Sequence, residues 1–142
     1  MQKSEELQIR LAVPEDSEAI AKVLYEAFAP FESGYTAQAF AATIISAEAI
    51  RKRFEEEGVI WVALKTGEIV GTVSIVPEGQ RLYMRSMAVM PSAQGGVGRE
   101  LLKTVIDFAT EKGFEELFLY TVPFLDRAIN LYEQNGFVRG DG

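Results

Sequence analysis

The chain has 142 residues, 48% of them hydrophobic and 25% charged, which is the balance of a soluble globular protein with a buried core. It contains no cysteine and no histidine. Disulfides, thiolate nucleophiles, zinc sites of Cys or His and a histidine-based triad are therefore excluded. A net charge of −7 argues against a nucleic-acid-binding protein, which needs a basic surface. We expect one domain over residues 1–142, with no metal and no nucleic-acid partner.

The same composition bears on location and substrate. No apolar run approaches the ~20 residues that span a bilayer, and the first residues lack the apolar segment of a signal peptide. These features predict a cytoplasmic protein with no membrane partner. The acidic charge mildly favours a cationic or amine substrate, and it is explained equally well as an aid to solubility.

Hydrophobic spacing and breaker residues predict strands and helices in alternation, hence a mixed sheet flanked by helices and an α/β fold class. Ser46 is suited to cap the start of a helix, and Gly58 its end. The continuous apolar character of residues 116–122 is typical of a buried parallel strand. In chain order the predicted elements are a strand over 8–13, helices over 14–28, 37–45 and 46–57, strands over 59–64, 69–76 and 81–90, a helix over 97–112, a strand over 116–122, a helix over 123–135 and the start of a last strand.

Three glycines in four positions connect the strand at 81–90 to the helix at 97–112. Gly95, Gly96 and Gly98 lie where the first amides of that helix lack intrahelical partners. The positive end of the helix and the missing side chains would let an anion approach the backbone, as in a phosphate-binding loop. No Gly-Lys-Ser/Thr follows, which excludes a P-loop, and Leu101 stands where a dinucleotide fingerprint needs glycine. A simple strand-to-helix turn remains the alternative.

Two segments resemble the GCN5-related N-acetyltransferase (GNAT) family. Residues 88–102, with Ala88-Val89-Met90-Pro91 and Gln94-Gly95-Gly96-Val97-Gly98, are similar to the motif A that binds the diphosphate of acetyl-coenzyme A. Residues 128–137, Ala-Ile-Asn-Leu-Tyr-Glu-Gln-Asn-Gly-Phe, are similar to motif B. The two motifs occur in the order found in the family, and the resemblance extends over nearly the whole chain.

The resemblance implies a fold and an activity. The implied fold is a mostly antiparallel central sheet that splays between its fourth and fifth strands, with about four helices. The implied activity is direct transfer of the acetyl group of acetyl-CoA to a primary amine of a small molecule or protein, the reaction of an acyltransferase. Transfer is expected to be direct because the chain has no cysteine to carry an acyl group. A non-catalytic acyl-CoA sensor, and a structural domain that binds nothing, are the alternatives.

The resemblance also implies the site residues. The backbone near Met87 would bind the pantetheine arm and polarise the acetyl carbonyl, unless this stretch is simply core strand. Arg99 and Lys103 would reach the outer phosphate. Tyr132 would act as the general acid that protonates the departing thiolate, although it also belongs to an apolar helical stripe that fits a core position. The implied cofactor-binding residues are Met87, Ala88, Val89, Gln94, Gly95, Gly96, Val97, Gly98, Arg99 and Ala128.

The general base is not assigned by the sequence. Many members of the family carry a glutamate on the fourth strand, where this chain has Arg81, Tyr83, Arg85 and Ser86. Glu78, Glu26 or Glu32 could act through water, and each is equally suited to be a surface charge.

Three departures from the family pattern stand out. The glycine loop is one residue short when counted from Pro91, and Leu125 replaces a frequent asparagine. The chain stops at Gly142, before the family's seventh strand. We expect either a truncated sequence or an edge completed by a second copy in a homodimer.

Overall fold

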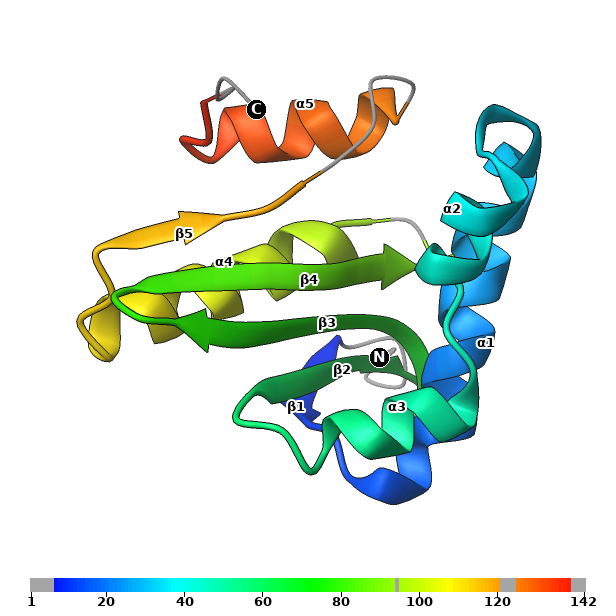
Figure 1. Cartoon of the computed structure of the whole chain (residues 1–142), viewed down its shortest axis with the longest axis horizontal. Coiled ribbons are helices and arrows are strands. Elements are labelled where there is room, and N and C mark those ends of the chain that lie inside the picture. The colour runs from blue at the N-terminus through cyan, green and yellow to red at the C-terminus, as the bar shows by residue number, and fades with distance from the viewer. Residues whose placement is uncertain (1–6, 94, 121–124, 139–142) are drawn as a thin grey trace, which may run out of the picture.

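A five-stranded mixed sheet organises the computed structural model, which describes residues 7–93, 95–120 and 125–138. The strand order is β1-β2-β3-β4-β5. The first four strands are antiparallel to their neighbours, and β5 runs parallel to β4 (Figure 1). The predicted mixed sheet and α/β class are therefore confirmed. The strands are β1 (Gln8–Leu11), β2 (Val59–Lys65), β3 (Glu68–Glu78), β4 (Arg81–Val89) and β5 (Glu116–Phe118).

Helices cover both faces of this sheet. Helices α1 and α3 pack on one face and α4 on the other, while α5 lies beside β5 at the edge (Figure 1). None of the described helices is long and apolar enough to cross a membrane. The helices are α1 (Ser17–Phe28), α2 (Ala37–Thr43), α3 (Ala47–Arg53), α4 (Val97–Glu111) and α5 (Asp126–Gln134), with 3₁₀ turns at Pro14–Asp16 and Ala29–Gly34.

The helical stripes predicted from apolar spacing form the two core layers. On α1, the side chains of Ile20, Val23 and Leu24 are at most 2% exposed and belong to one core cluster with residues of β2 and with Ala88 of β4. On α4, Leu101 and Leu102 are fully buried against the opposite face. Side chains three and four residues apart share one helix face, and burying that face stabilises each helix on the sheet.

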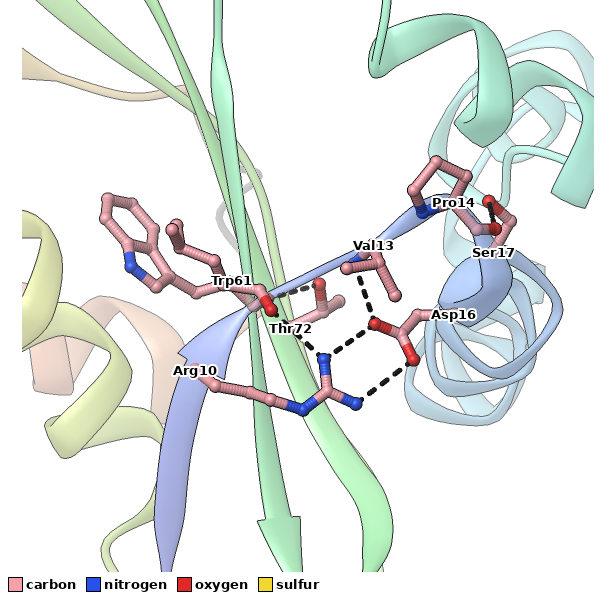
Figure 2. Close-up of polar contacts among 8 residues, drawn as sticks. Arg10, Val13, Pro14, Asp16, Ser17, Trp61 and Thr72 are labelled. Carbon is pink, nitrogen blue, oxygen red and sulfur yellow. Dashed lines mark hydrogen bonds and ion pairs between the residues drawn. The ribbon is translucent and has the colours of Figure 1, made fainter.

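An ion pair fixes the corner between β1 and α1. The Arg10 guanidinium donates to both Asp16 carboxylate oxygens, Nη1 to Oδ2 at 2.8 Å and Nη2 to Oδ1 at 3.2 Å (Figure 2). Asp16 Oδ2 also accepts the Val13 amide at 2.8 Å, and Ser17 Oγ donates to the Pro14 carbonyl at 2.7 Å. The Arg10 hydrogen bond holds the pKa of Asp16 below its usual range. Asp16 therefore satisfies a helix-entry amide and an arginine together.

Some predicted boundaries are wrong for identifiable reasons. Strand β1 ends at Leu11, two residues early, because the chain turns into the Asp16 corner. Helix α3 ends at Arg53 because the next amides bond three residues back, so Gly58 is not its cap. Glycine is needed at that position for another reason, since a Cβ there would lie 2.6 Å from the Ile75 carbonyl oxygen. Strand β5 ends at Phe118 and is half-buried, whereas a buried strand over 116–122 was expected. Residues 121 and 122 of that prediction lie outside the described part of the chain.

Candidate functional site

The sheet opens between β4 and β5. The two strands pair at Arg81↔Glu116, Leu82↔Leu117 and Tyr83↔Phe118. Strand β4 has nine residues, so six of them continue to Val89 without a β5 partner in the described part of the chain. The splay expected between the fourth and fifth strands is therefore present, and it leaves backbone groups that need partners.

Alternation along β4 decides which amides face this opening. The Met90 amide donates to the Val70 carbonyl of β3 at 2.8 Å. Successive residues of a strand direct their N–H and C=O groups to opposite sides. Met87 and Val89 therefore present these groups to the opening, and Ala88 presents its own to β3. The Ala88 side chain is 5% exposed and packs in the α1 layer.

A β-bulge divides β4 into two parts. Ser74 pairs with Ser86 and Ile75 with Met84, so Arg85 is an extra residue in β4. An extra residue reverses the alternation of the side chains that follow it. Leu82 and Met84 before the bulge, and Met87 and Val89 after it, all pack in the α4 layer, whereas Arg85 and Ser86 contact residues of and after α3.

The glycine loop ends at the N-terminus of α4, beside the end of β4. Gly95 and Gly96 have φ values of +99° and +90°, a left-handed conformation that is strained for other residues. Gly96 precedes the helix, and a Cβ on it would meet nothing within 4 Å. Val97 is 1% exposed and belongs to the core layer of α4. Gln94 lies outside the described residues.

A lysine that sequence reasoning missed lies beside this loop. A Cβ on Gly95 would stand 3.7 Å from Lys65 Nζ. Lys65 ends β2, and the hairpin that follows leads into β3, whose start pairs with the end of β4. A cation is thus placed next to the exposed amides. Two other cations sit further along α4: Arg99 is exposed, and Lys103 pairs with Asp107 at 3.2 Å on the surface.

Helix α5 packs beside the start of α4, at Gly98. The side chains of Met87 and Val89 from β4 reach the same place, since a Cβ placed on Gly98 would stand 3.8 Å from each of them. Tyr132 of α5 is partly buried, with its ring 5.7 Å from that of Phe137. Burial raises the pKa of the Tyr132 phenol to about 12. Ala128 lies one turn earlier on α5 and is half-buried.

Polar groups also gather on the other side of β4, at the bulge. Arg53 Nη1 donates to Ser74 Oγ and to Ser86 Oγ, both at 3.1 Å. Arg85 Nη2 donates to Glu56 Oε1 at 2.8 Å. Burial, and then the charge of Arg85, lower the pKa of Arg53 to about 10. The candidate bases from sequence, Glu26, Glu32 and Glu78, are all exposed.

A splayed mixed sheet beside a glycine-lined helix start defines the class of the acyl-CoA-binding acetyltransferase folds. The chain belongs to the acetyltransferase (GNAT) family, whose profile matches residues 19–137. The family expected from motifs A and B is thus confirmed.

Several curated relatives support this assignment. The uncharacterized N-acetyltransferase YhfO of Bacillus subtilis (strain 168) is 32% identical over 145 residues, covering 96% of this chain and 93% of that protein. The uncharacterized N-acetyltransferase YjgM of Escherichia coli (strain K12) is 31% identical, covering 87% of this chain and 77% of that protein. The probable N-acetyltransferase camello of Xenopus tropicalis is 37% identical over 86 residues, and the match covers 58% of this chain and 39% of the frog protein.

Solved structures agree on the fold. The PaiA N-acetyltransferase from Thermoplasma acidophilum, in complex with coenzyme A, has a TM-score of 0.80 at 18% identity, covering 96% of this chain and 92% of that one. The ribosomal-protein-S18-alanine N-acetyltransferase from Escherichia coli has a TM-score of 0.78 at 21% identity, covering 95% and 79%. At these identities the likeness shows the fold.

Proposed function

We propose that the chain transfers the acetyl group of acetyl-CoA directly to a primary amine. The observation that carries this proposal is the juxtaposition of two sets of backbone amides, those of β4 beyond its last β5 pair and those at the start of α4. The first set suits an extended amide-containing arm, and the second suits a diphosphate. Family membership and a coenzyme A-bound structural relative support the same donor.

Different residues along the opening would bind different parts of acetyl-CoA. The amides at Val97 and Gly98, with Gly95 and Gly96 leaving space, would hold the diphosphate, and Lys65 would add a positive charge. Met87 and Val89 would hydrogen-bond the pantetheine arm as a neighbouring strand does. The Met87 amide would also donate to the acetyl carbonyl oxygen and stabilise the charge that develops there.

Tyr132 would supply the proton for the leaving group. Acetyl-CoA provides an activated thioester; the amine nitrogen bonds to its carbonyl carbon, and the C–S bond breaks. Tyr132 is protonated at neutral pH, as any phenol is, and burial raises its pKa further, to about 12. It would donate to the thiolate sulfur where the same desolvation raises the proton affinity of the sulfur. The nitrogen loses one proton to solvent, and Tyr132 regains from solvent the proton that it donated to the sulfur.

The experiment combines binding with turnover. Acetyl-CoA should raise the melting temperature, and an amine panel should reveal thiol release. Gly96→Ala should weaken acetyl-CoA binding at least about tenfold, since it disturbs amides that bind an anion. Gly79→Ala is the matched control, because Gly79 also has a positive φ and open space around it but lies in the β3–β4 turn.

The possible results test the glycine loop, the transferase activity and acetyl-CoA binding separately. Equal loss of affinity in the two variants would remove the glycine loop from the binding site. Binding without thiol release on any amine would contradict the transferase and support a sensor. Absence of any acetyl-CoA effect on the melting temperature would contradict both.

A further inference from the structure

Two serine hydroxyls lie opposite each other on β3 and β4 at the bulge, and one arginine binds both. Ser74 and Ser86 are directly paired in the ladder, next to the place where the register shifts. Arg53, the last residue of α3, donates from Nη1 to both hydroxyl oxygens at 3.1 Å. Ser74 is 3% exposed, and Arg53 is half-buried. A charged donor in such surroundings forms stronger hydrogen bonds than a neutral one, so this contact connects α3 firmly to two strands.

The same end of α3 also holds the extra residue of β4. Arg85 Nη2 donates to Glu56 Oε1 at 2.8 Å, and the Glu56 amide in turn donates to the Arg53 carbonyl at 3.1 Å. Gly58 packs closely on β3, since a Cβ there would lie 2.6 Å from the Ile75 carbonyl oxygen. The short segment from Arg53 to Gly58 is thus fixed against the strand that pairs with the bulge. Its side chains bind Arg85 and the residue that follows it.

The two hydrogen bonds of Arg53 require one register of β4. Paired residues share a face of the sheet, and Ser86 lies on the face of α3 because the extra residue, Arg85, precedes it. If the extra residue came after Ser86, the Ser86 hydroxyl would enter the apolar layer of α4 and lose the guanidinium. A buried hydroxyl without a partner costs free energy. The contact with Arg53 therefore favours the observed position of the bulge over its neighbours.

We propose that Arg53 is a positioning residue: its hydrogen bonds to Ser74 and Ser86 hold the bulge before Ser86 and so keep the backbone groups of Met87 and Val89 facing the opening. This inference rests on the proposed function, in which those groups bind the pantetheine arm and the acetyl carbonyl. Arg53 acts through β4 and not on the substrate. Ser86 directly precedes Met87, so a shift of Ser86 displaces the amide next to the thioester, and a displacement of about 1 Å at a reacting group can cost about 100-fold in rate.

The test separates the two parts of acetyl-CoA. In Arg53→Met, kcat should fall about 10- to 100-fold and the Kd of acetyl-CoA should rise about 3- to 10-fold, because the amides beside the arm are no longer held in place. The Kd of 3′-phospho-ADP, which has the diphosphate but no arm, should not change, because the glycine loop is untouched. Ser86→Ala should give the same pattern, and the double substitution should add little to either single one. Arg53→Lys should recover part of kcat, because it keeps a charged donor.

Two control variants separate positioning from stability. Arg51→Met removes an exposed arginine of the same helix, paired with Glu18, and should leave kcat and both Kd values unchanged. Asp16→Asn weakens the distant β1–α1 corner and should also leave them unchanged at temperatures where melting curves show it folded. An equal rise in the Kd of acetyl-CoA and of 3′-phospho-ADP in Arg53→Met, or no change in kcat and Kd, would overturn the positioning role.

Amide hydrogen exchange, measured by NMR without ligand, tests Arg53 independently of the proposed function. In the unsubstituted chain, the amides of Met87 and Val89 should exchange faster than that of Ala88, which faces β3. This order should be lost in Arg53→Met and kept in Arg51→Met. If the chain neither binds acetyl-CoA nor acetylates an amine, the transferase fails. Loss of the exchange order in Arg53→Met would then still support control of β4 by Arg53, and an unchanged order would overturn it.

Discussion

Gly98 of α4 and Leu131 of α5 lie so close that a Cβ placed on Gly98 would stand 3.2 Å from Leu131 Cδ2. This spacing is below the 3.4–4 Å of ordinary van der Waals contact, so a side chain at this position would require Leu131 to shift by a few tenths of an ångström. Tyr132 is the next residue of α5, and the contact therefore also sets how far that tyrosine lies from the opening beside β4.

Gly98→Ala should lower the free energy of unfolding by about 1–3 kcal/mol, because the added methyl overpacks the contact between the two helices. The measurement is a double-mutant cycle with Leu131→Ala, read by denaturant unfolding. Since the second substitution removes the atom that the methyl would meet, the cost of Gly98→Ala should be smaller in the Leu131→Ala background. Strictly additive costs would show that the two side chains do not interact.

Tyr132→Phe should reduce kcat by about 10²-fold or more while leaving the Kd of acetyl-CoA unchanged, because it removes a proton donor and keeps the buried ring. Steady-state turnover and calorimetric binding measure the two effects. Tyr25→Phe is a suitable control, since Tyr25 is 51% exposed on α1. Unchanged kcat in Tyr132→Phe would take this residue out of the mechanism.

Lys65→Met should weaken coenzyme A binding about 3- to 10-fold at low ionic strength, because a positive charge near the glycine loop is lost. The same substitution should not change binding of pantetheine, which has no phosphate. Lys112→Met, at the far end of α4, is the control, and added salt should reduce the difference between the two variants. A similar loss for pantetheine and coenzyme A would mean that Lys65 supports the fold and not the phosphates.

Asp16→Asn should destabilise the protein by about 1–2 kcal/mol near neutral pH, since it breaks a partly buried, bidentate contact with Arg10. The pKa of Asp16 is lowered in the folded state. Its contribution is therefore present above the ordinary carboxyl pKa and is lost as the pH falls through the lower folded value. Urea unfolding across the acid range should show the variant and the unsubstituted protein converging at low pH. The neighbouring Glu15→Gln, which is exposed, should show no such convergence.

The sequence predicted those features that depend on neighbours close along the chain. The stripe on α4 follows from helical periodicity, and the cap of α3 follows from one serine, whose Oγ accepts the Ala49 amide at 3.1 Å. The strands predicted over 59–64 and 69–76 also follow from local pattern, and they pair as β2 and β3. For the site, the glycine loop was recognised because its requirement is local, namely positive φ at Gly95 and Gly96.

Features that depend on distant residues were missed. Lys65 reaches Gly95 only because the sheet places the β2–β3 turn beside the end of β4. Arg53 meets Ser86 across 33 residues of sequence, and no local pattern marks an arginine as the partner of two serines. The sequence shows that β4 has no carboxylate. That Arg53 of α3 lies against Ser86 of β4 is seen only in three dimensions.

The extra residue at Arg85 decides which layer each later residue of β4 joins. Because of it, Met87 and Val89 lie in the layer of α4, on the same side as Leu82 and Met84, and Ser86 lies in the layer of α3. If β4 ran as a regular strand with Arg85 in register, Met87 and Val89 would enter the layer of α3 instead, and their amides would face β3. The backbone donors at the opening therefore come from these two residues because of one irregular position.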